Sequence, residues 1–111
     1  MYSIQMNSDI WIYLSAFNDS VRTRDWSALA LLHTEDAVVE FEGVPAMRGR
    51  AAIEAGYRDA PPADTISLVH YFEDGDTHEV TYRCDSQDDR TGTFRLTMRD
   101  GLISHNLVSV S

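Results

Sequence analysis

The sequence predicts an α+β domain in which helices pack on one face of a curved antiparallel sheet. Apolar residues in the N-terminal third recur at helical spacing. After Thr65 the chain changes to four strand-like runs rich in β-branched and aromatic residues. Asp-Gly turn signals separate two pairs of these runs, at 74–76 and at 100–101. The 111 residues suffice for one domain, which we place at residues 1–111.

Three helices are expected before the four runs. Ser8 or Asp9 can cap the first helix, whose apolar residues are Ile10, Trp11, Leu14, Phe17 and Val21. Asp25 can cap a second, shorter helix that carries Trp26, Leu29, Ala30 and His33 on one face. Strand formers then occupy 38–41, and a third helix is expected from Gly49 until Pro61 and Pro62 end it.

The C-terminal runs indicate what covers the two faces of the sheet. Phe94, Leu96 and Met98 alternate with polar residues, so one face is apolar. The preceding segment, QDDRTG, is expected to form a loop. The last run, residues 102–110, does not alternate cleanly, which is typical of a strand covered on both faces. We therefore expect helices on one face and a second copy of the chain on the other, giving a homodimer.

Charge and composition exclude several classes of partner. The net charge of −9 argues against nucleic acid, which requires clustered basic residues, and against an anionic membrane surface. A small molecule of low polarity remains as the expected partner. The single Cys84 excludes an intrachain disulfide and a zinc finger. No HxH or HExxH spacing and no glycine-rich phosphate loop occurs, so neither a metal nor an organic cofactor is expected.

The N-terminal residues have neither the basic segment nor the long apolar run of a signal peptide or membrane span. A cytoplasmic protein is therefore expected.

Three segments carry a family resemblance: RDWSALALLHTEDAVVEF, MRGRAAIEAGY and MRDGLISHNLVSV. Together they resemble the nuclear-transport-factor-2-like superfamily, and within it the ketosteroid isomerase and SnoaL-like polyketide cyclase branch. The resemblance implies a cone-shaped curved antiparallel sheet wrapped around three N-terminal helices, a cystatin-like α+β barrel with an interior cavity. It also implies dimerisation through the open face of the sheet. Because this fold serves many functions, the resemblance identifies no reaction.

The resemblance also shows what this chain lacks. Ketosteroid isomerases use an Asp base together with a Tyr and a protonated Asp that stabilise the oxyanion. At the matching positions this sequence has Phe41, Phe17 and Phe94, which cannot transfer protons. We expect these rings to line a mainly apolar cavity with Trp26, Leu96 and Met98 as further ligand-binding residues. If Phe41 faces the cavity, strand alternation turns Glu40 and Glu42 outward.

His33, Tyr57 and His105 are the candidate acid–base residues. The resemblance places His33 and Tyr57 at pocket-type positions, and an imidazole titrates near neutral pH. Each also has a purely structural explanation: a helix-terminal His, a core tyrosine with its hydroxyl at the rim, and a wall residue of the last strand. Arg83-Cys84-Asp85 resembles the Arg-x-Asp of limonene epoxide hydrolases, but the second acid of that site is absent. His70 and His78 are expected to be exposed.

Two functions remain open from the sequence. One is an enzyme without cofactors that isomerises or cyclises an apolar metabolite, polyketide-, steroid- or terpenoid-like, with His and Tyr as acid and base. The alternative is a non-catalytic ligand-binding or dimerisation module. The three phenylalanines favour the second, whereas His33 beside Tyr57 favours the first.

Overall fold

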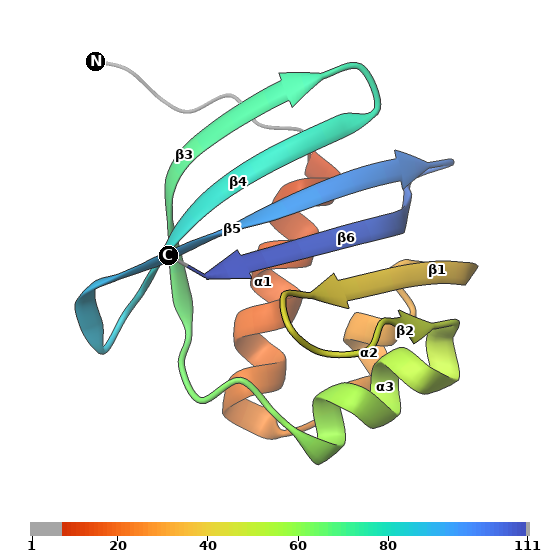
Figure 1. The fold of residues 1–111 in the computed structure, drawn as a ribbon, viewed down its shortest axis with the longest axis horizontal. Coiled ribbons are helices and arrows are strands. Elements are labelled where there is room, and N and C mark those ends of the chain that lie inside the picture. The colour runs from red at the N-terminus through yellow and green to blue at the C-terminus, as the bar shows by residue number, and fades with distance from the viewer. Residues whose placement is uncertain (1–7, 111) are drawn as a thin grey trace.

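A computed structural model describes residues 8–110 and confirms the α+β prediction (Figure 1). Three helices and six strands follow one another along the chain: α1 (Ser8–Thr23), α2 (Ser27–Ala30), β1 (His33–Phe41), β2 (Met47–Arg48), α3 (Arg50–Asp59), β3 (Ile66–Asp74), β4 (Thr77–Cys84), β5 (Gln87–Arg99) and β6 (Leu102–Val110). Residues 66–110 form four strands and no helix, as the turn signals predict.

All six strands belong to one curved sheet, in the order β2-β1-β6-β5-β4-β3. Its pairs are antiparallel except for β1 and β6, which run parallel. Figure 1 shows the long strands β3–β6 arching over α1, while α3 lies below β1 and β2. The concave face of the sheet and the helices therefore enclose one interior.

Apolar spacing explains how α1 fills this interior. Ile10, Tyr13, Leu14, Phe17 and Val21 are all buried. They follow the i, i+3, i+4, i+7 pattern of a helix with one apolar face. Trp11, which the sequence placed among the helical apolar residues, is 45% exposed and lies off that face.

The second helix is shorter than the sequence predicts, which changes the position of His33. Helix α2 ends at Ala30, and the backbone N–H of Ile103 donates a 2.9 Å hydrogen bond to the carbonyl of Leu32. His33 then pairs with Ile103 as the first residue of β1. The prediction of His33 on a helical face is wrong, because pairing with β6 draws the chain into the sheet one turn earlier.

The two hairpin turns confirm the Asp-Gly signals. Asp100 and Gly101 both have positive φ, 54° and 80°, between the paired residues Arg99 and Leu102. Two positive φ values in a two-residue loop are those of a type I′ turn, which matches the right-handed twist of the strands.

The segment QDDRTG is part of β5, so its prediction as a loop is wrong. The turn between β4 and β5 consists of Asp85 and Ser86. Cys84 pairs with Gln87, but the next residue of β4, Arg83, pairs with Thr91. Residues 88–90 therefore bulge out of the ladder, a register shift that residue spacing alone does not reveal.

A second bulge explains the irregular pattern of β6. Met98 pairs with Ile103, whereas Thr97 pairs with His105, so the register shifts at this point. Ile103, Asn106 and Val108 are consequently all buried. The bulge therefore explains the irregular pattern of residues 102–110 without requiring that both faces of the strand be covered.

The prediction that His78 is exposed is also wrong. Its side chain is 3% exposed and its Nδ1 lies 2.5 Å from the hydroxyl of Tyr71. The alternation of β4 places His78 on the same face as Val80 and Tyr82, which are both buried.

Candidate ligand-binding site

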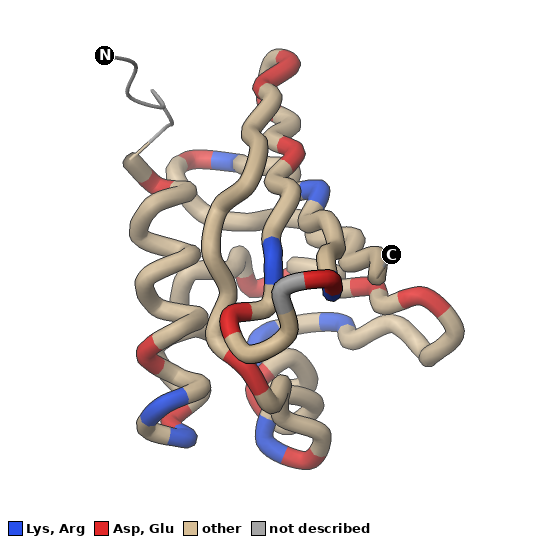
Figure 2. The backbone as a smooth tube through the Cα atoms, turned by 90° about the vertical axis from the view of Figure 1, so that its left-hand side faces the viewer, with Lys and Arg blue, Asp and Glu red and all other residues tan. Residues whose placement is uncertain are grey.

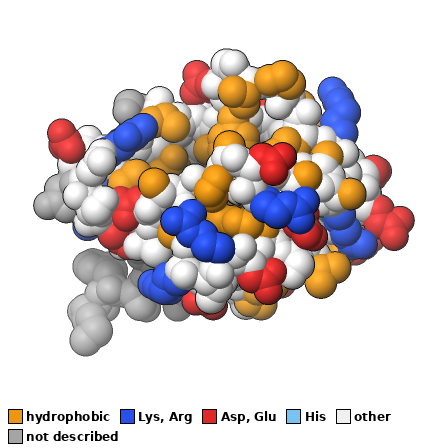
Figure 3. All heavy atoms as spheres, turned by 90° about the horizontal axis from the view of Figure 1, so that it is seen from below, with side chains coloured by type: hydrophobic (Ala, Val, Ile, Leu, Met, Phe, Trp, Pro, Cys, Tyr) orange, Lys and Arg blue, Asp and Glu red, His pale blue; other side chains and the backbone are white. Residues whose placement is uncertain are grey.

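A cavity of about 340 Å³ opens at one end of the enclosed interior. It lies between the loop at 60–64, which follows α3, the turn between β4 and β5, and the C-terminal ends of β1 and β6. Figure 3 views the molecule from below, and hydrophobic side chains gather in the middle of this face with basic side chains beside them.

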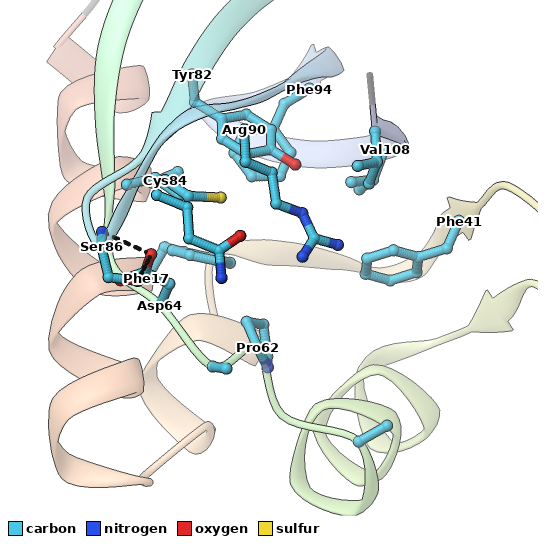
Figure 4. A pocket seen from close by; sticks show the side chains of 15 residues that line it. Phe17, Phe41, Pro62, Asp64, Tyr82, Cys84, Ser86, Arg90, Phe94 and Val108 are labelled. Atoms are coloured by element: carbon cyan, nitrogen blue, oxygen red, sulfur yellow. Dashed lines mark hydrogen bonds between the residues drawn. The ribbon is translucent and has the colours of Figure 1, made fainter.

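Aromatic rings form the apolar wall of the cavity. Phe17 of α1, Phe41 of β1 and Phe94 of β5 all line it. The Phe17 and Phe94 ring centroids are 5.7 Å apart, and Tyr82 stacks on Phe94 at 4.7 Å. Val108 completes this wall from β6 (Figure 4). Flat rings from four elements thus present a largely apolar surface to a ligand.

A carboxylate fixes the rim of the cavity. Asp64 Oδ2 accepts hydrogen bonds from the backbone N–H of Ser86, 2.8 Å, and from its hydroxyl, 2.6 Å (Figure 4). Asp85 accepts further hydrogen bonds from the hydroxyls of Thr65 and Ser67, which hold its pKa below the usual value. The loop after α3 and the β4–β5 turn are therefore joined by charge-assisted hydrogen bonds.

Tyr82 and Cys84 supply the polar atoms of the β4 wall. Burial raises the pKa of the Tyr82 hydroxyl, and the charge of Arg90 opposes that shift. Burial, and then the carboxylate of Asp64, raise the pKa of Cys84. The thiol is therefore protonated at neutral pH, and it does not resemble the activated thiolate of a nucleophilic enzyme.

Gly92 makes room for the Tyr82 hydroxyl. A Cβ atom at this position would lie 2.4 Å from the hydroxyl oxygen and 2.6 Å from the backbone carbonyl oxygen of Ser109. Real Cβ atoms do not approach so closely, and the Ser109 carbonyl belongs to the paired strand β6. We expect Gly92→Ala to lower the free energy of unfolding by about 1–3 kcal/mol, the usual cost of overpacking. Urea unfolding measures this loss, and an unchanged midpoint would contradict it.

A second group of polar side chains lies buried in the interior and is not part of the cavity lining. Tyr13 accepts a 3.2 Å hydrogen bond from Asn106 Nδ2. Three other polar atoms of this group, His33 Nε2, the Tyr57 hydroxyl and Asn106 Oδ1, are buried without a hydrogen bond of good geometry to the described residues, although the Tyr57 hydroxyl is close enough to Tyr13 for the two to affect each other's pKa. Orphaned buried atoms are rare in proteins, so three in one region mark it as unusual.

The protonation state of His33 follows from its surroundings. Its Nδ1 lies 2.9 Å from the carbonyl oxygen of Leu29, which can only accept, so Nδ1 carries the proton and Nε2 has a free lone pair. Burial lowers the pKa of His33, which is therefore neutral at pH 7. Burial also raises the pKa of Tyr57 far above its usual value. The group thus offers one neutral base and protonated phenols.

The comparison with known families agrees with this architecture. The family model of the SnoaL-like domain matches residues 14–106. The chain belongs to the SnoaL-like domain family. This confirms the resemblance to the nuclear-transport-factor-2-like superfamily. No curated protein sequence matches the chain at a significant level.

Solved structures share the fold of this SnoaL-like domain. A candidate polyketide cyclase from Sinorhizobium meliloti is 24% identical with a TM-score of 0.73, and the match covers 98% of this chain and 100% of that protein. A candidate ketosteroid isomerase from Kribbella flavida is 20% identical with a TM-score of 0.71, and the match covers 94% of this chain and 78% of that protein. An epoxide hydrolase/cyclase-like enzyme of pyran ring formation in salinomycin is 21% identical with a TM-score of 0.74, and the match covers 94% of this chain and 88% of that protein. At these identities the likeness concerns the fold.

The structure brings together only some of the candidate residues of the SnoaL-like domain. Phe17, Phe41 and Phe94 line the cavity, whereas Leu96 is buried and Met98 half-buried away from it. Trp26 stacks on Tyr57 at 5.1 Å, and Phe41 meets the edge of Tyr57 at 6.0 Å. Tyr57 is therefore behind the aromatic wall.

His105 lies on the opposite face of the sheet from Phe41. Its Nε2 is 2.6 Å from Glu40 Oε2, and both side chains are partly exposed. Alternation with Ile103 had suggested a position on the cavity wall, but the bulge between them reverses the face that His105 occupies. Glu42 is exposed, as alternation with Phe41 predicts.

Sequence reasoning missed the polar residues of the cavity: Asp64, Tyr82, Ser86 and Arg90. The pattern of β4, in which Val80 and Tyr82 share a face, was the one available signal for Tyr82. Arg90 follows two acidic residues in a polar segment, so nothing local distinguishes it from a solvent-exposed loop residue.

Neither a metal site nor a membrane span is apparent within residues 8–110. No group of three or more side chains with suitable ligand atoms comes together there. None of the described helices combines the length and the apolar character needed to cross a bilayer.

Proposed function

We propose that this SnoaL-like domain binds a small, largely apolar molecule of the polyketide, steroid or terpenoid kind in the cavity. The observation that carries the proposal is the aromatic wall of Phe17, Phe41 and Phe94, open at the rim to a few polar side chains. An apolar concavity with a small number of convergent polar groups is the usual form of a small-molecule site.

The size of the cavity narrows the range of ligands. Its volume of about 340 Å³ is near the lower end of the roughly 300–1,000 Å³ found for small-molecule sites. This favours a compact ligand of one or two rings over a complete steroid skeleton.

The charge distribution supports a small molecule over a nucleic acid. Basic positions are scattered singly or in pairs among acidic ones over the described chain (Figure 2). A nucleic-acid surface would gather several cations on one face, where they could replace counterions along the phosphate backbone.

Native mass spectrometry of gently purified protein tests the proposal. The expected result is a small molecule bound to the unaltered protein and absent from an Ala63→Trp variant. Ala63 is exposed and lines the cavity, so an indole there blocks the site with little change to the core. A ligand retained equally by both proteins would show that it binds elsewhere.

A second candidate function is acid–base catalysis on such a ligand. The buried group around His33 favours it, because this neutral imidazole has a free lone pair and its ring centroid lies 6.4 Å from that of the protonated Tyr13, which pairs a general base with a general acid. The aromatic wall separates this group from the cavity, so catalysis requires that Phe41 or Phe17 moves when the ligand binds. His105 has no role in this scheme, because its side chain lies outside the cavity, in hydrogen-bond contact with Glu40.

We expect no ketosteroid isomerase activity. A positioned base contributes about 10²–10⁴-fold to such a proton transfer, and Phe41 cannot supply it. Among the side chains that the structure describes, the cavity lining contains one carboxylate, Asp64, which is held at the rim by Ser86. The isomerisation of a β,γ-unsaturated ketosteroid should therefore proceed at the buffer rate, with a known isomerase as control. Turnover well above that rate would contradict the prediction that the protein has no ketosteroid isomerase activity.

We also propose a homodimer that forms through the outer face of the sheet. Paired residues form a row across this face: Phe72, Glu79, Arg95, Leu107 and Glu40. Phe72 is 59% exposed, and the row alternates apolar, acidic and basic side chains that a second copy can complement.

Light scattering at micromolar concentration should give twice the mass of the chain. Leu107→Arg, which adds a charge to the half-buried middle of the row, should give the monomer mass. A monomer mass for the unaltered protein would contradict the dimer.

A further inference from the structure

We propose that Arg90 and the Tyr82 hydroxyl bind an oxyanion of the ligand, so that the preferred ligand is an apolar molecule carrying one carboxylate or similar group. This inference rests on the proposed function, because it assigns the ligand class of the same cavity. It makes Arg90 and Tyr82 the residues that determine specificity, in place of the acid–base residues expected from the sequence.

The bulge in β5 is what directs Arg90 toward the cavity. Residues 88–90 have no partners on β4, since Thr91 pairs with Arg83 and Gln87 with Cys84. Bulges commonly re-aim a side chain beside a functional site. Figure 4 shows the Arg90 guanidinium directed into the space bordered by Tyr82, Phe41 and Pro62.

Arg90 has no carboxylate partner within 4.0 Å among the described side chains. Four of the nine arginines form such ion pairs: Arg22 with Asp19, Arg50 with Glu35, Arg58 with Glu54 and Arg99 with Asp36. Arg90 differs from the other arginines without one because it lines the cavity. Asp64, the one acidic residue among the described side chains of the cavity lining, already accepts two hydrogen bonds from Ser86. In a chain of net charge −9, an exposed cation at the rim of an apolar cavity, without a carboxylate partner among the described side chains, is available for an anionic ligand.

The Tyr82 hydroxyl supplies a second donor close to this cation. It forms no hydrogen bond with the described residues, its ring is held by stacking on Phe94, and Gly92 leaves room for the hydroxyl. The charge of Arg90 acts on this hydroxyl, since it opposes the rise in the Tyr82 pKa caused by burial. A fixed phenol beside a guanidinium is a suitable donor pair for carboxylate-like oxygens.

Two fluorescent probes with nearly the same aromatic body test the inference. Anilinonaphthalene sulfonate carries an oxyanion, and phenylnaphthylamine is neutral. At low ionic strength, where an exposed Arg is least screened, the anion should bind about tenfold more tightly than the neutral probe. Arg90→Gln should remove this difference, and Tyr82→Phe should reduce it. Both variants should lower the affinity for the anion more than the affinity for the neutral probe.

Arg95→Gln is the matched control, because it removes the same charge from the outer face of the sheet. Equal affinities for the two probes, or equal effects of Arg90→Gln and Arg95→Gln, would overturn the inference and leave the cavity proposal intact. Anion binding that survives Ala63→Trp would also overturn it, since the oxyanion would then bind outside the cavity. If neither probe binds, the proposed function itself fails.

Discussion

Replacing Phe94 with alanine is expected to lower the free energy of unfolding by about 3–5 kcal/mol, the range for large aromatic side chains deleted from a core. Phe94 is 2% exposed, and its ring centroid lies 5.5 Å from that of Tyr13, 5.7 Å from Phe17 and 4.7 Å from Tyr82. Removing it takes away the ring that three others contact, and it leaves a void that the surrounding rings fill only in part.

Leu31→Ala is the control for this substitution. Leu31 is 64% exposed and lies outside the row proposed for the homodimer, so its loss should change stability by no more than about 0.5 kcal/mol. Urea unfolding should show a much lower midpoint for Phe94→Ala and little change for Leu31→Ala. Equal shifts in the two variants would show that the interior does not depend on this aromatic wall.

His33 should make the stability of the protein depend on pH. Burial holds its pKa below the value of about 6.5 that an unfolded chain has. As pH falls below about 6.5, the unfolded chain therefore binds a proton that the folded protein does not, and stability declines until the folded pKa is reached. One proton contributes at most about 1.4 kcal/mol per pH unit.

His33→Gln should remove this contribution, whereas His70→Gln, at an exposed position, should retain it. Free energies of unfolding measured between about pH 7.5 and 5 isolate the effect, since carboxyl groups titrate mainly near pH 4. Identical pH profiles for His33→Gln and the unaltered protein would mean that His33 does not titrate differently in the two states. The same variants, assayed with an identified ligand, separate a catalytic His33 from a structural one.

Most of the fold could be predicted from local patterns, because helices and tight turns are determined mainly by residues that are neighbours in the sequence. Apolar spacing predicted α1, and Asp100-Gly101 predicted the turn before β6. The resemblance to the SnoaL-like family, which the family match confirms, added the curvature of the sheet.

The candidate site was less predictable because register and helix length depend on distant partners. Pairing with β6 takes His33 out of the predicted helix, and the bulge after Ile103 turns His105 to the outer face. The bulge in β5 exposes Arg90 to the cavity. Only the bulge in β6 leaves a signal in residue spacing, the irregular pattern of residues 102–110, and only Tyr82 among the polar residues of the cavity has a pattern signal, so Asp64, Ser86 and Arg90 could be found only in three dimensions.

The parallel pairing of β1 with β6 has a consequence for how the chain folds. His33 meets Ile103 and Phe41 meets Val108, so strands from the two ends of the sheet-forming region are neighbours. The entropy of closing so long a loop must be overcome before these contacts form, and such non-local topologies fold slowly. Hairpins β3–β4 and β5–β6, whose strands are adjacent in sequence, can form first. The cavity, which takes Phe41 from β1 and Val108 from β6, is thus among the last parts of the molecule to assemble.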